Sequence, residues 1–254
     1  MDNQTFTITF GDRAENHVGM FTIGEAAAEG FNLEDLNRAK LCFEQNGIQC
    51  DLIDLKILLP DELKANAQDA YILIARGGLN CMIKPHNSDD FFQEQSRLEK
   101  DTKAFIYGRV VNKKARHNLC FGSQSQEPDY EQGKGRIIAF DQVPLLNHVR
   151  QVFPIIIGEK GSGLVAEGNY YYDINKTYIG YHGDSERRKV IAIRVGAKFP
   201  LHYQWYCQSK TVGNRGDIML GHGDVYIMSE KAVGTDWKKK NILTLRHAAG
   251  FNIK

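Results

Sequence analysis

The sequence predicts a mainly β protein with flanking helices, and three observations support this class. From residue 101 onward, short runs rich in β-branched and aromatic residues recur between turns that carry glycine, asparagine or aspartate. One helical stretch interrupts these runs at 143–153. Residues 1–100 instead alternate helical and strand patterns, so we expect a small α/β unit there, followed by a rolled β domain at 101–254.

Composition limits the class of protein further. The 254 residues suffice for one large β domain with a smaller unit attached, and the 42% hydrophobic content is typical of a folded globular protein. The 32 basic and 31 acidic residues leave a net charge of +1. This balance argues against tight non-specific binding to nucleic acid, although it is compatible with a local basic face.

Cysteine use and the N-terminal segment indicate the compartment. The five cysteines are an odd number without a CxxC pair, which argues against a disulfide framework and against a structural zinc site. Residues 1–20 lack the basic start and the apolar centre of a signal peptide. No stretch approaches the roughly 18 apolar residues that a membrane span requires. We therefore expect a soluble intracellular protein, cytoplasmic or nuclear, that does not associate with a membrane.

The first hundred residues contain one well-marked helix. It begins after Asn32, which fits the N-cap position, and ends near Gly47, with Glu34 and Asp35 favourably placed in its first turn. A strand is expected at 48–55, a shorter helix after Pro60, and a second strand at 70–75. None of these segments carries a catalytic signature of its own.

The remainder of the chain is dominated by predicted strands. Ten runs have this character: AFIYGRVV, HNLCF, GRIIAF, NYYYD, TYIGYH, VIAIRVG, FPLHYQWYC, DIMLGH, DVYIMS and LTLRHA. Many short strands at regular spacing are typical of a sandwich or a jelly roll. The loop SQSQEPDYEQGKG at 123–135 is the longest polar, turn-rich segment, and such loops on β scaffolds often carry function.

His182 and Asp184, in the triplet HGD, are the first candidates for a functional site. Residues i and i+2 of an extended chain point to the same side, so this imidazole and this carboxylate can aim at one point. Two histidines and one carboxylate on one face of a metal form the facial triad typical of non-haem iron(II) oxygenases. By itself the triplet is a weak signal, because a solvated turn produces the same pattern.

The surroundings of the triplet resemble the AlkB branch, and more distantly the TET branch, of the iron(II)- and 2-oxoglutarate-dependent dioxygenases. NYYYDINKTYIGYHGDSE followed by KVIAIRVG has the family's order of an N-x-Y strand, a turn, a strand ending in HxD and an apolar strand. Further similar segments are GRVVNKKARHNLCF, EPDYEQGKGRIIAF, IMLGHGDVYIMS and NILTLRHAAG. The similarity spans roughly 104–250. It implies a cupin-like double-stranded β-helix, a form of jelly roll, within 101–254, and it leaves out residues 1–100.

The third metal ligand is expected to be His247. His202 lies mid-strand among aromatic residues and is better explained as a packed or hydrogen-bonded core histidine. His222 belongs to the GHGD hairpin, where the resemblance implies a histidine that is not a ligand. His247 lies on the last predicted strand, where a double-stranded β-helix returns to the mouth of the barrel. With His182 and Asp184 it would hold iron(II).

The resemblance also implies 2-oxoglutarate as cosubstrate. Asn169 and Tyr171 occupy the N-x-Y positions that hydrogen-bond it in the family. In the family an arginine follows the last iron histidine and pairs with the distal carboxylate of the cosubstrate. Here the corresponding stretch, GTDWKKKN, contains no histidine, and only seven residues follow His247. A different residue must therefore supply the anchor, and the sequence also leaves open another reductant in the same pocket.

Three residues are candidates for this anchor. Arg194 comes first, because the alternation of VIAIRVG places it on one face with small side chains, although a solvent-facing strand arginine fits the pattern equally well. Arg246 aligns with a family arginine, but as the neighbour of His247 it should point to the opposite side of the strand. Lys254 at the C-terminus is the third candidate.

The AlkB resemblance makes a methylated nucleobase, flipped out or single-stranded, the leading substrate, and TET-like oxidation of 5-methylcytosine would use the same ligands. The basic stretch expected to meet phosphates consists of Lys113, Lys114, Arg116 and His117, and Arg109 is a further expected substrate contact. The aromatic residues expected to stack on a base are Tyr107, Phe121 and Tyr130. Ordinary surface charges and core aromatics would give the same pattern.

Two other classes of function remain compatible with the sequence. One is an iron- and 2-oxoglutarate-dependent hydroxylase of a protein or a small metabolite, which suits the weak net charge. The other is a non-catalytic jelly-roll binding module in which HGD is only a turn. The sequence does not predict the oligomeric state.

Overall fold

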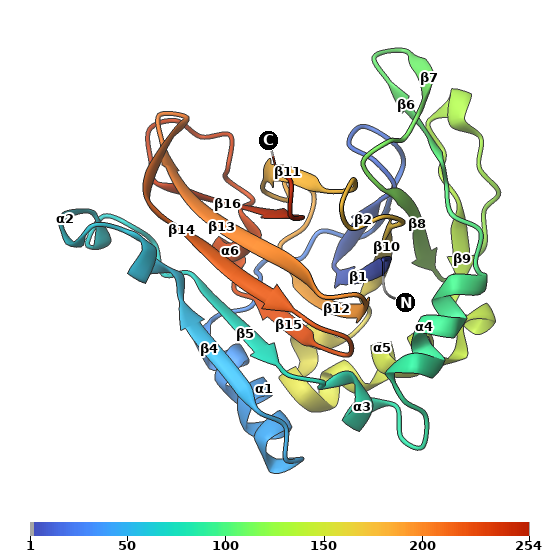
Figure 1. Ribbon diagram of the computed structural model, residues 1–254, viewed down its shortest axis with the longest axis horizontal. Coiled ribbons are helices and arrows are strands. Elements are labelled where there is room, and N and C mark those ends of the chain that lie inside the picture. The colour runs from blue at the N-terminus through green and yellow to red at the C-terminus, as the bar shows by residue number, and fades with distance from the viewer. Residues whose placement is uncertain (1–2, 254) are drawn as a thin grey trace.

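The computed structural model describes residues 3–253 and contains a large and a small β-sheet that pack together, with helices on the outer side of the large one (Figure 1). The prediction of a mainly β protein with flanking helices is confirmed. None of the helices in the described range combines the length and the apolar character needed to cross a bilayer.

The large sheet has eight strands, and all neighbours in it are antiparallel except the last pair. In spatial order these are β4 (Cys50–Asp54), β5 (Tyr71–Ala75), β15 (Val225–Met228), β12 (Val190–Gly196), β1 (Thr5–Gly11), β10 (Val165–Tyr171), β8 (His117–Gly122) and β9 (Ile137–Ala139).

The small sheet is wholly antiparallel and has four strands. In spatial order these are β11 (Ile179–His182), β16 (Thr244–Ala249), β13 (Phe199–Cys207) and β14 (Lys210–Leu220). Two separate hairpins project from the body: β2 (Arg13–Glu15) with β3 (Thr22–Gly24), and β6 (Lys103–Ile106) with β7 (Arg109–Asn112). The run AFIYGRVV, expected as one strand, is therefore the β6–β7 hairpin, which turns at Tyr107 and Gly108, both with positive φ.

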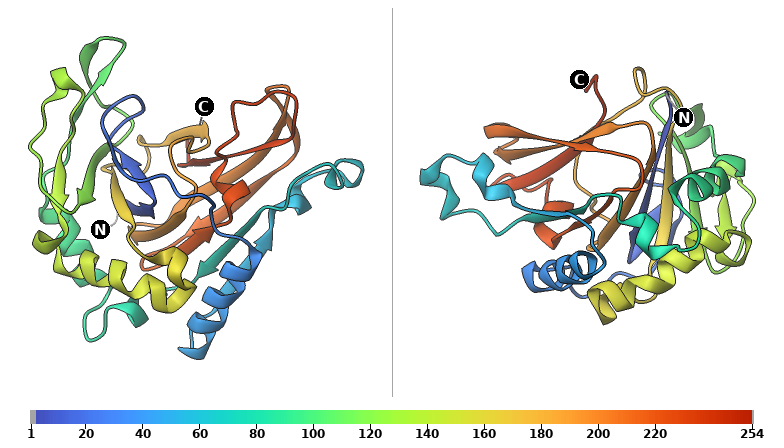
Figure 2. Two further views of the ribbon diagram at one scale, coloured as in Figure 1. Left: turned by 180° about the vertical axis from the view of Figure 1, so that it is seen from behind. Right: turned by 60° about the horizontal axis from the view of Figure 1, so that its bottom comes forward.

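The helices lie mainly on the side of the large sheet that faces away from the small sheet (Figure 2). The α-helices are α1 (Leu33–Gln45), α2 (Asp61–Lys64), α3 (Leu79–Met82), α4 (Ser88–Arg97), α5 (Pro144–Ile157) and α6 (Glu230–Val233). Four 3-10 turns complete the description: η1 (Leu55–Leu58), η2 (Tyr130–Gln132), η3 (Phe140–Gln142) and η4 (Glu159–Gly161). As expected, Asn32 caps α1, and its side chain forms a reciprocal capping box with Asp35.

Along β1 and β12, successive side chains alternate between the face of the large sheet that packs against the helices and the face that lies toward the small sheet. In β1, Phe6, Ile8 and Phe10 pack in the core beneath α1, α4 and α5, while Thr7 and Thr9 face the small sheet. In β12 the corresponding residues are Ile191, Ile193 and Val195 on the helical side and Val190, Ala192 and Arg194 on the other. A second core fills the space between the two sheets. Each strand of the sheet centre is thus buried on both faces.

Apart from the short β2–β3 hairpin, the strands of the N-terminal residues belong to the large sheet. β1 lies between β10 and β12 and is hydrogen-bonded to both, while β4 and β5 extend the edge of the same sheet beside β15. The expected unit at 1–100 therefore contributes the central strand of the large sheet, and position 100 does not mark a boundary between sheets. The pattern TFTITF is a strand pattern, but its partners lie more than 150 residues away along the chain.

Candidate metal centre

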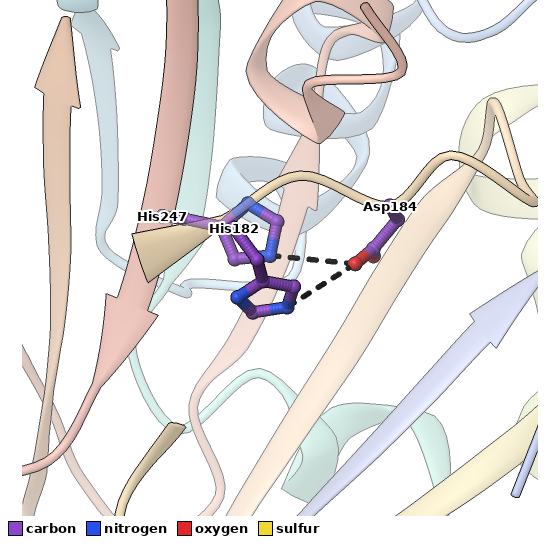
Figure 3. Close-up of side chains that lie close together, drawn as sticks. All are labelled: His182, Asp184 and His247. Atoms are coloured by element: carbon purple, nitrogen blue, oxygen red, sulfur yellow. Dashed lines mark ion pairs between the residues drawn. The ribbon is translucent and has the colours of Figure 1, made fainter. Parts of the chain in front are cut away.

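The three predicted metal ligands converge at the edge of the small sheet (Figure 3). His182 ends β11 and pairs directly with His247 of β16 in the antiparallel register, and Asp184 follows two residues later. Asp184 Oδ1 lies 3.3 Å from His182 Nε2 and 3.6 Å from His247 Nε2. One nitrogen or oxygen from each side chain lies within 4.8 Å of the other two, so a single cation can reach all three.

A close backbone contact holds the HGD turn in place. The Asp184 amide donates to the carbonyl of Val233 at the end of α6, at 3.0 Å. A Cβ on Gly183 would lie 2.1 Å from the carbonyl oxygen of Gly234, so only glycine allows the turn to approach that segment. The short turn between the two ligands is therefore fixed against α6 rather than free in solvent.

The protonation states suit metal coordination. Burial, helped by the neighbouring His182, lowers the pKa of His247 to about 4, so its imidazole is neutral at physiological pH. Burial alone would raise the pKa of Asp184, but the Arg187 guanidinium and the two imidazoles outweigh it and hold that pKa below its usual value. His182 Nδ1 lies 2.8 Å from the Gly180 carbonyl, an acceptor, which leaves the Nε2 lone pair facing Asp184.

A cavity of about 770 Å³ adjoins the three ligands and is lined by both sheets. The large sheet contributes side chains from four adjacent strands: Thr7 and Thr9 of β1, Glu167, Asn169 and Tyr171 of β10, Arg194 of β12, and Tyr226 and Met228 of β15. Arg116, which precedes β8, and the loop residues Trp237 and Lys238 line it as well. The ligands of the small sheet therefore face a polar wall supplied by the large sheet.

Arg194 is the most unusual residue of this wall. Its side chain is fully buried, and none of its three guanidinium nitrogens has a hydrogen-bond partner among residues 3–253. Its Cζ lies 5.1 Å from the ring centre of Phe199 and 5.8 Å from that of Tyr171, and burial lowers its pKa. The cross-strand neighbour Thr7 also has a buried hydroxyl without a partner in this range. The alternative of a solvent-facing arginine is therefore wrong.

Asn169 and Tyr171 both lie in the cavity wall, as expected. Asn169 is also part of a buried network: its Oδ1 accepts from Arg116 Nε at 2.6 Å and from Asn118, and its Nδ2 donates to Glu167 Oε1 at 2.9 Å. The amide orientation is thereby fixed before any ligand binds.

Arg246 does not reach the cavity, which corrects its assignment as a cosubstrate contact. Its guanidinium carbon lies 3.9 Å from the ring centre of Tyr206 and 5.1 Å from that of Trp237, on the opposite side of β16 from His247. The alternation of side chains along the strand explains this position. Lys254, the third candidate anchor, lies outside the described residues.

The two histidines excluded as ligands have other partners. His202 Nδ1 lies 2.5 Å from Asp217 Oδ1, and its Nε2 lies 2.9 Å from the Gly250 carbonyl, so it ties two segments together. His222 Nδ1 accepts from the Gly196 amide at 2.9 Å. Neither belongs to the His–Asp–His group.

Of the predicted substrate-binding residues, the structure places one in the cavity wall and the others elsewhere. Arg116 lines the cavity, and Tyr107 stands 97% exposed at the tip of the β6–β7 hairpin, next to the exposed Arg109. Tyr130 lies outside the cavity wall, and its hydroxyl donates to the buried Asp101 at 2.8 Å. Tyr130 is therefore held in a structural contact and is not placed to stack on a base.

Two further assignments need correction. Phe121 is fully buried in the core beneath the helices, so it cannot stack on a ligand. Lys113 donates to Asn16 and, at 3.1 Å, to Asn118 Oδ1, and burial lowers its pKa to about 8. It therefore supports the network around Asn169 rather than meeting phosphates. Of the same stretch, Lys114 is exposed, and His117 stacks on Tyr172 with ring centres 4.7 Å apart.

Several cavity residues were missed by the sequence analysis because no motif marks them. They are Thr7, Thr9, Glu15, His17, Trp237 and Lys238. The first four come from β1 and the β2–β3 hairpin, which the resemblance does not cover. Trp237 donates from Nε1 to Ser185 Oγ at 3.1 Å and so packs beside the HGD turn.

Glu15 brings an additional carboxyl group to the cavity wall. Burial, reinforced by the nearby Glu186 and Glu167, raises the pKa of Glu15 to about 7. The Arg187 guanidinium acts in the opposite direction and lowers the pKa of Glu15, but it does not outweigh burial. Arg187 already pairs with Glu167 and Glu186, at 2.6 and 2.7 Å. This wall of the cavity therefore holds more carboxyl groups than cations.

Comparison with known proteins gives one close relative. No family model matches the chain. A protein of Acanthamoeba polyphaga mimivirus, named "Uncharacterized protein R156", is 51% identical over 247 residues, which cover 97% of this chain and 96% of that protein.

We expect Glu15→Gln to stabilise the protein above pH 7 but not at pH 4.5. The folded state keeps the Glu15 proton up to about pH 7, whereas the unfolded chain releases it near pH 4.5, so folding becomes less favourable as pH rises between these values. Because the carboxyl is only half-buried, solvent screens the effect, and the gain should be about 1 kcal/mol. Thermal unfolding of both proteins across this range measures it. The exposed Glu25→Gln variant is the control, and equal gains at all pH values would contradict the assignment.

Proposed function

The chain belongs to one family with the mimivirus protein, and we propose that it is an iron(II)- and 2-oxoglutarate-dependent dioxygenase. One observation carries the proposal. Two imidazoles and a carboxylate converge beside a cavity whose wall holds a buried arginine with no protein partner in the described range. The first group suits a metal, and the second suits an anionic ligand.

The topology supports a double-stranded β-helix as the core. The four central strands of the large sheet, β15-β12-β1-β10, and the small sheet, β11-β16-β13-β14, supply eight antiparallel strands in two packed layers. Along the chain, β10, β12 and β15 belong to the large sheet, while β11, β13, β14 and β16 belong to the small one. The eighth place, between β10 and β12, is taken by β1. In this assignment the N-terminal strand closes the roll.

The donor set fits iron(II). His182, Asp184 and His247 provide two nitrogens and one oxygen from one side, which leaves the other coordination positions open toward the cavity. When bound, the iron together with 2-oxoglutarate supplies the activation of oxygen and the oxidation of a C–H bond, which side chains alone cannot perform.

The residues of the large sheet would bind and orient the cosubstrate. The Arg194 guanidinium can donate two parallel hydrogen bonds to a carboxylate, and the Thr7 hydroxyl beside it can donate a third. Phe199 and Tyr171 pack against Arg194 and keep water from it, which strengthens its attraction for an anion. Asn169, fixed by Arg116 and Glu167, presents a polar group to the same cavity.

A nucleobase is the proposed substrate because aromatic and basic groups occur together where the cavity reaches the surface. Trp237 and the exposed Lys238 both line the cavity, and Lys238 Nζ lies 5.4 Å from the indole ring centre. Arg116 lies in the wall as well. Aromatic faces that stack on bases, next to cations that meet phosphates, are the usual means of binding single-stranded nucleic acid.

Anaerobic titration with iron(II) tests the metal assignment. We expect the wild type to bind one equivalent, and His182→Ala and His247→Ala to bind at least about 100-fold more weakly, since each removes a ligand. His222→Ala is the matched control and should bind as the wild type does. If His247→Ala retained iron binding and His222→Ala lost it, the assignment of His247 as a ligand would be refuted. If the wild type bound no iron(II), the proposal of an iron-dependent enzyme would be refuted.

Replacing Arg194 separates cosubstrate binding from metal binding. We expect Arg194→Met to retain iron(II) but to bind 2-oxoglutarate about 30-fold or more weakly, because a buried charge pair is lost. The same variant should unfold at a higher temperature without ligands, since it removes a buried charge that has no protein partner in the described range. Isothermal titration and thermal unfolding measure both effects. Unchanged 2-oxoglutarate affinity would eliminate Arg194 as the anchor.

Succinate release identifies the substrate class. We expect methylated single-stranded oligonucleotides, and not peptides, to stimulate it, and Tyr107→Ala to weaken oligonucleotide binding about tenfold through lost stacking. Ile57→Ala, which removes an exposed apolar side chain elsewhere on the molecule, serves as the control. Stimulation by peptides or metabolites alone would instead support the hydroxylase alternative.

A further inference from the structure

Arg187 joins the proposed metal centre to the wall of the large sheet. It follows Asp184 by three residues, and its side chain is only 3% exposed. Its guanidinium donates to Glu167 Oε2 at 2.6 Å and to Glu186 Oε1 at 2.7 Å, and its Nε lies 3.8 Å from Asp184 Oδ2. One guanidinium thus faces three carboxylates.

The two oxygens of Asp184 face different partners. Oδ1 is directed to the two imidazoles, 3.3 Å from His182 Nε2 and 3.6 Å from His247 Nε2. Oδ2 is directed to Arg187. The carboxylate is therefore oriented with one oxygen toward the metal centre and the other toward a fixed cation.

We propose that Arg187 is a positioning residue that keeps Asp184 a one-oxygen metal ligand. This inference rests on the proposed function, because it concerns the same metal. Carboxylates bind cations through one oxygen or through both. If the second oxygen of Asp184 also bound the metal, it would occupy one of the positions that a bidentate cosubstrate and dioxygen need. The orientation of the Asp184 carboxylate therefore determines how many coordination positions stay open.

The residues around Arg187 restrict the position of its side chain. Glu167 Oε1 accepts from Asn169 Nδ2 at 2.9 Å and from Asn118 Nδ2 at 3.3 Å, so this partner is itself fixed. A Cβ on Gly11 would lie 2.7 Å from the Lys189 carbonyl oxygen and 3.1 Å from Arg187 Cδ, so this glycine allows the segment that carries Arg187 to pack against the end of β1. A guanidinium presents several donors in one plane, whereas the single ammonium of lysine cannot face three carboxylates with the same geometry.

The number of water molecules on bound manganese(II) tests this role without any turnover. Water-proton relaxation should report about three metal-bound waters in the wild type and about two in Arg187→Met, where Asp184 is free to bind through both oxygens. Arg188→Met is the matched control, since the neighbouring Arg188 is exposed and pairs with Glu230 at 2.9 Å, away from the metal centre. It should leave the water number unchanged. Arg187→Lys, which restores the charge but not the planar set of donors, should give a number between those of Arg187→Met and the wild type.

The outcomes distinguish this inference from the proposed function. If the wild type binds no manganese(II), the metal centre itself is refuted. If the wild type carries about three waters and folded Arg187→Met carries the same number, only the role of Arg187 is refuted, and a merely weaker metal affinity would not rescue it. Should Arg187→Met fail to fold, a metal-loaded wild-type crystal structure decides: Asp184 must contact the metal through Oδ1 alone, and bidentate coordination overturns the inference.

Discussion

The pairing of β1 between β10 and β12 is the constraint on which the rest of the structure depends. Because both edges of β1 are hydrogen-bonded, the large sheet is continuous across its centre. The same strand places Phe6, Ile8 and Phe10 in the core beneath the helices, and Thr7 and Thr9 in the cavity wall. Without β1, the strands that carry Asn169 and Arg194 would have no common neighbour and no fixed spacing. A single threonine–hydrophobe alternation thus serves the core and the site at once.

Electrostatics inside the cavity follow from this frame. The wall buries charged groups that a core would normally exclude, and burial of a charge is costly unless it is paired. Arg187 satisfies this condition with three carboxylates, and Asp184 is held in its ionised form. Arg194 does not satisfy it within the described residues, which is the kind of local violation expected where a protein binds an anion. In the proposed function the two arginines have different tasks: Arg187 orients a metal ligand, and Arg194 attracts the cosubstrate.

How far the sequence predicts this structure depends on the range of the interactions involved. The cap of α1, the strand runs and the same-side placement of His182 and Asp184 are local and could be predicted from spacing alone. The choice of His247 required the resemblance, because a partner 63 positions away leaves no local signal. The central position of β1 and the burial of Phe121 depend on which strands pair, and one sequence without coordinates does not specify that. The wrong assignments for Lys113 and Arg246 have the same origin, since charge alone does not reveal the partner of a cation.

The division of labour between the sheets also limits where specificity can arise. The proposed metal ligands come from β11, β16 and the turn between β11 and β12, while the wall with the buried Arg194 comes from β1, β10 and β12. In the proposed function the metal and the cosubstrate therefore lie between two layers of paired strands. The exposed residues of the cavity wall come instead from connecting segments: Val18 in the turn of the β2–β3 hairpin, Ser185 in the turn after β11, and Lys238 in the loop that also carries Trp237. Loops tolerate change far better than paired strands do. In the proposed function, relatives that keep the triad, Arg187 and Arg194 differ in substrate through the segments with Val18 and Lys238, because neither segment takes part in the sheet pairing that positions the site.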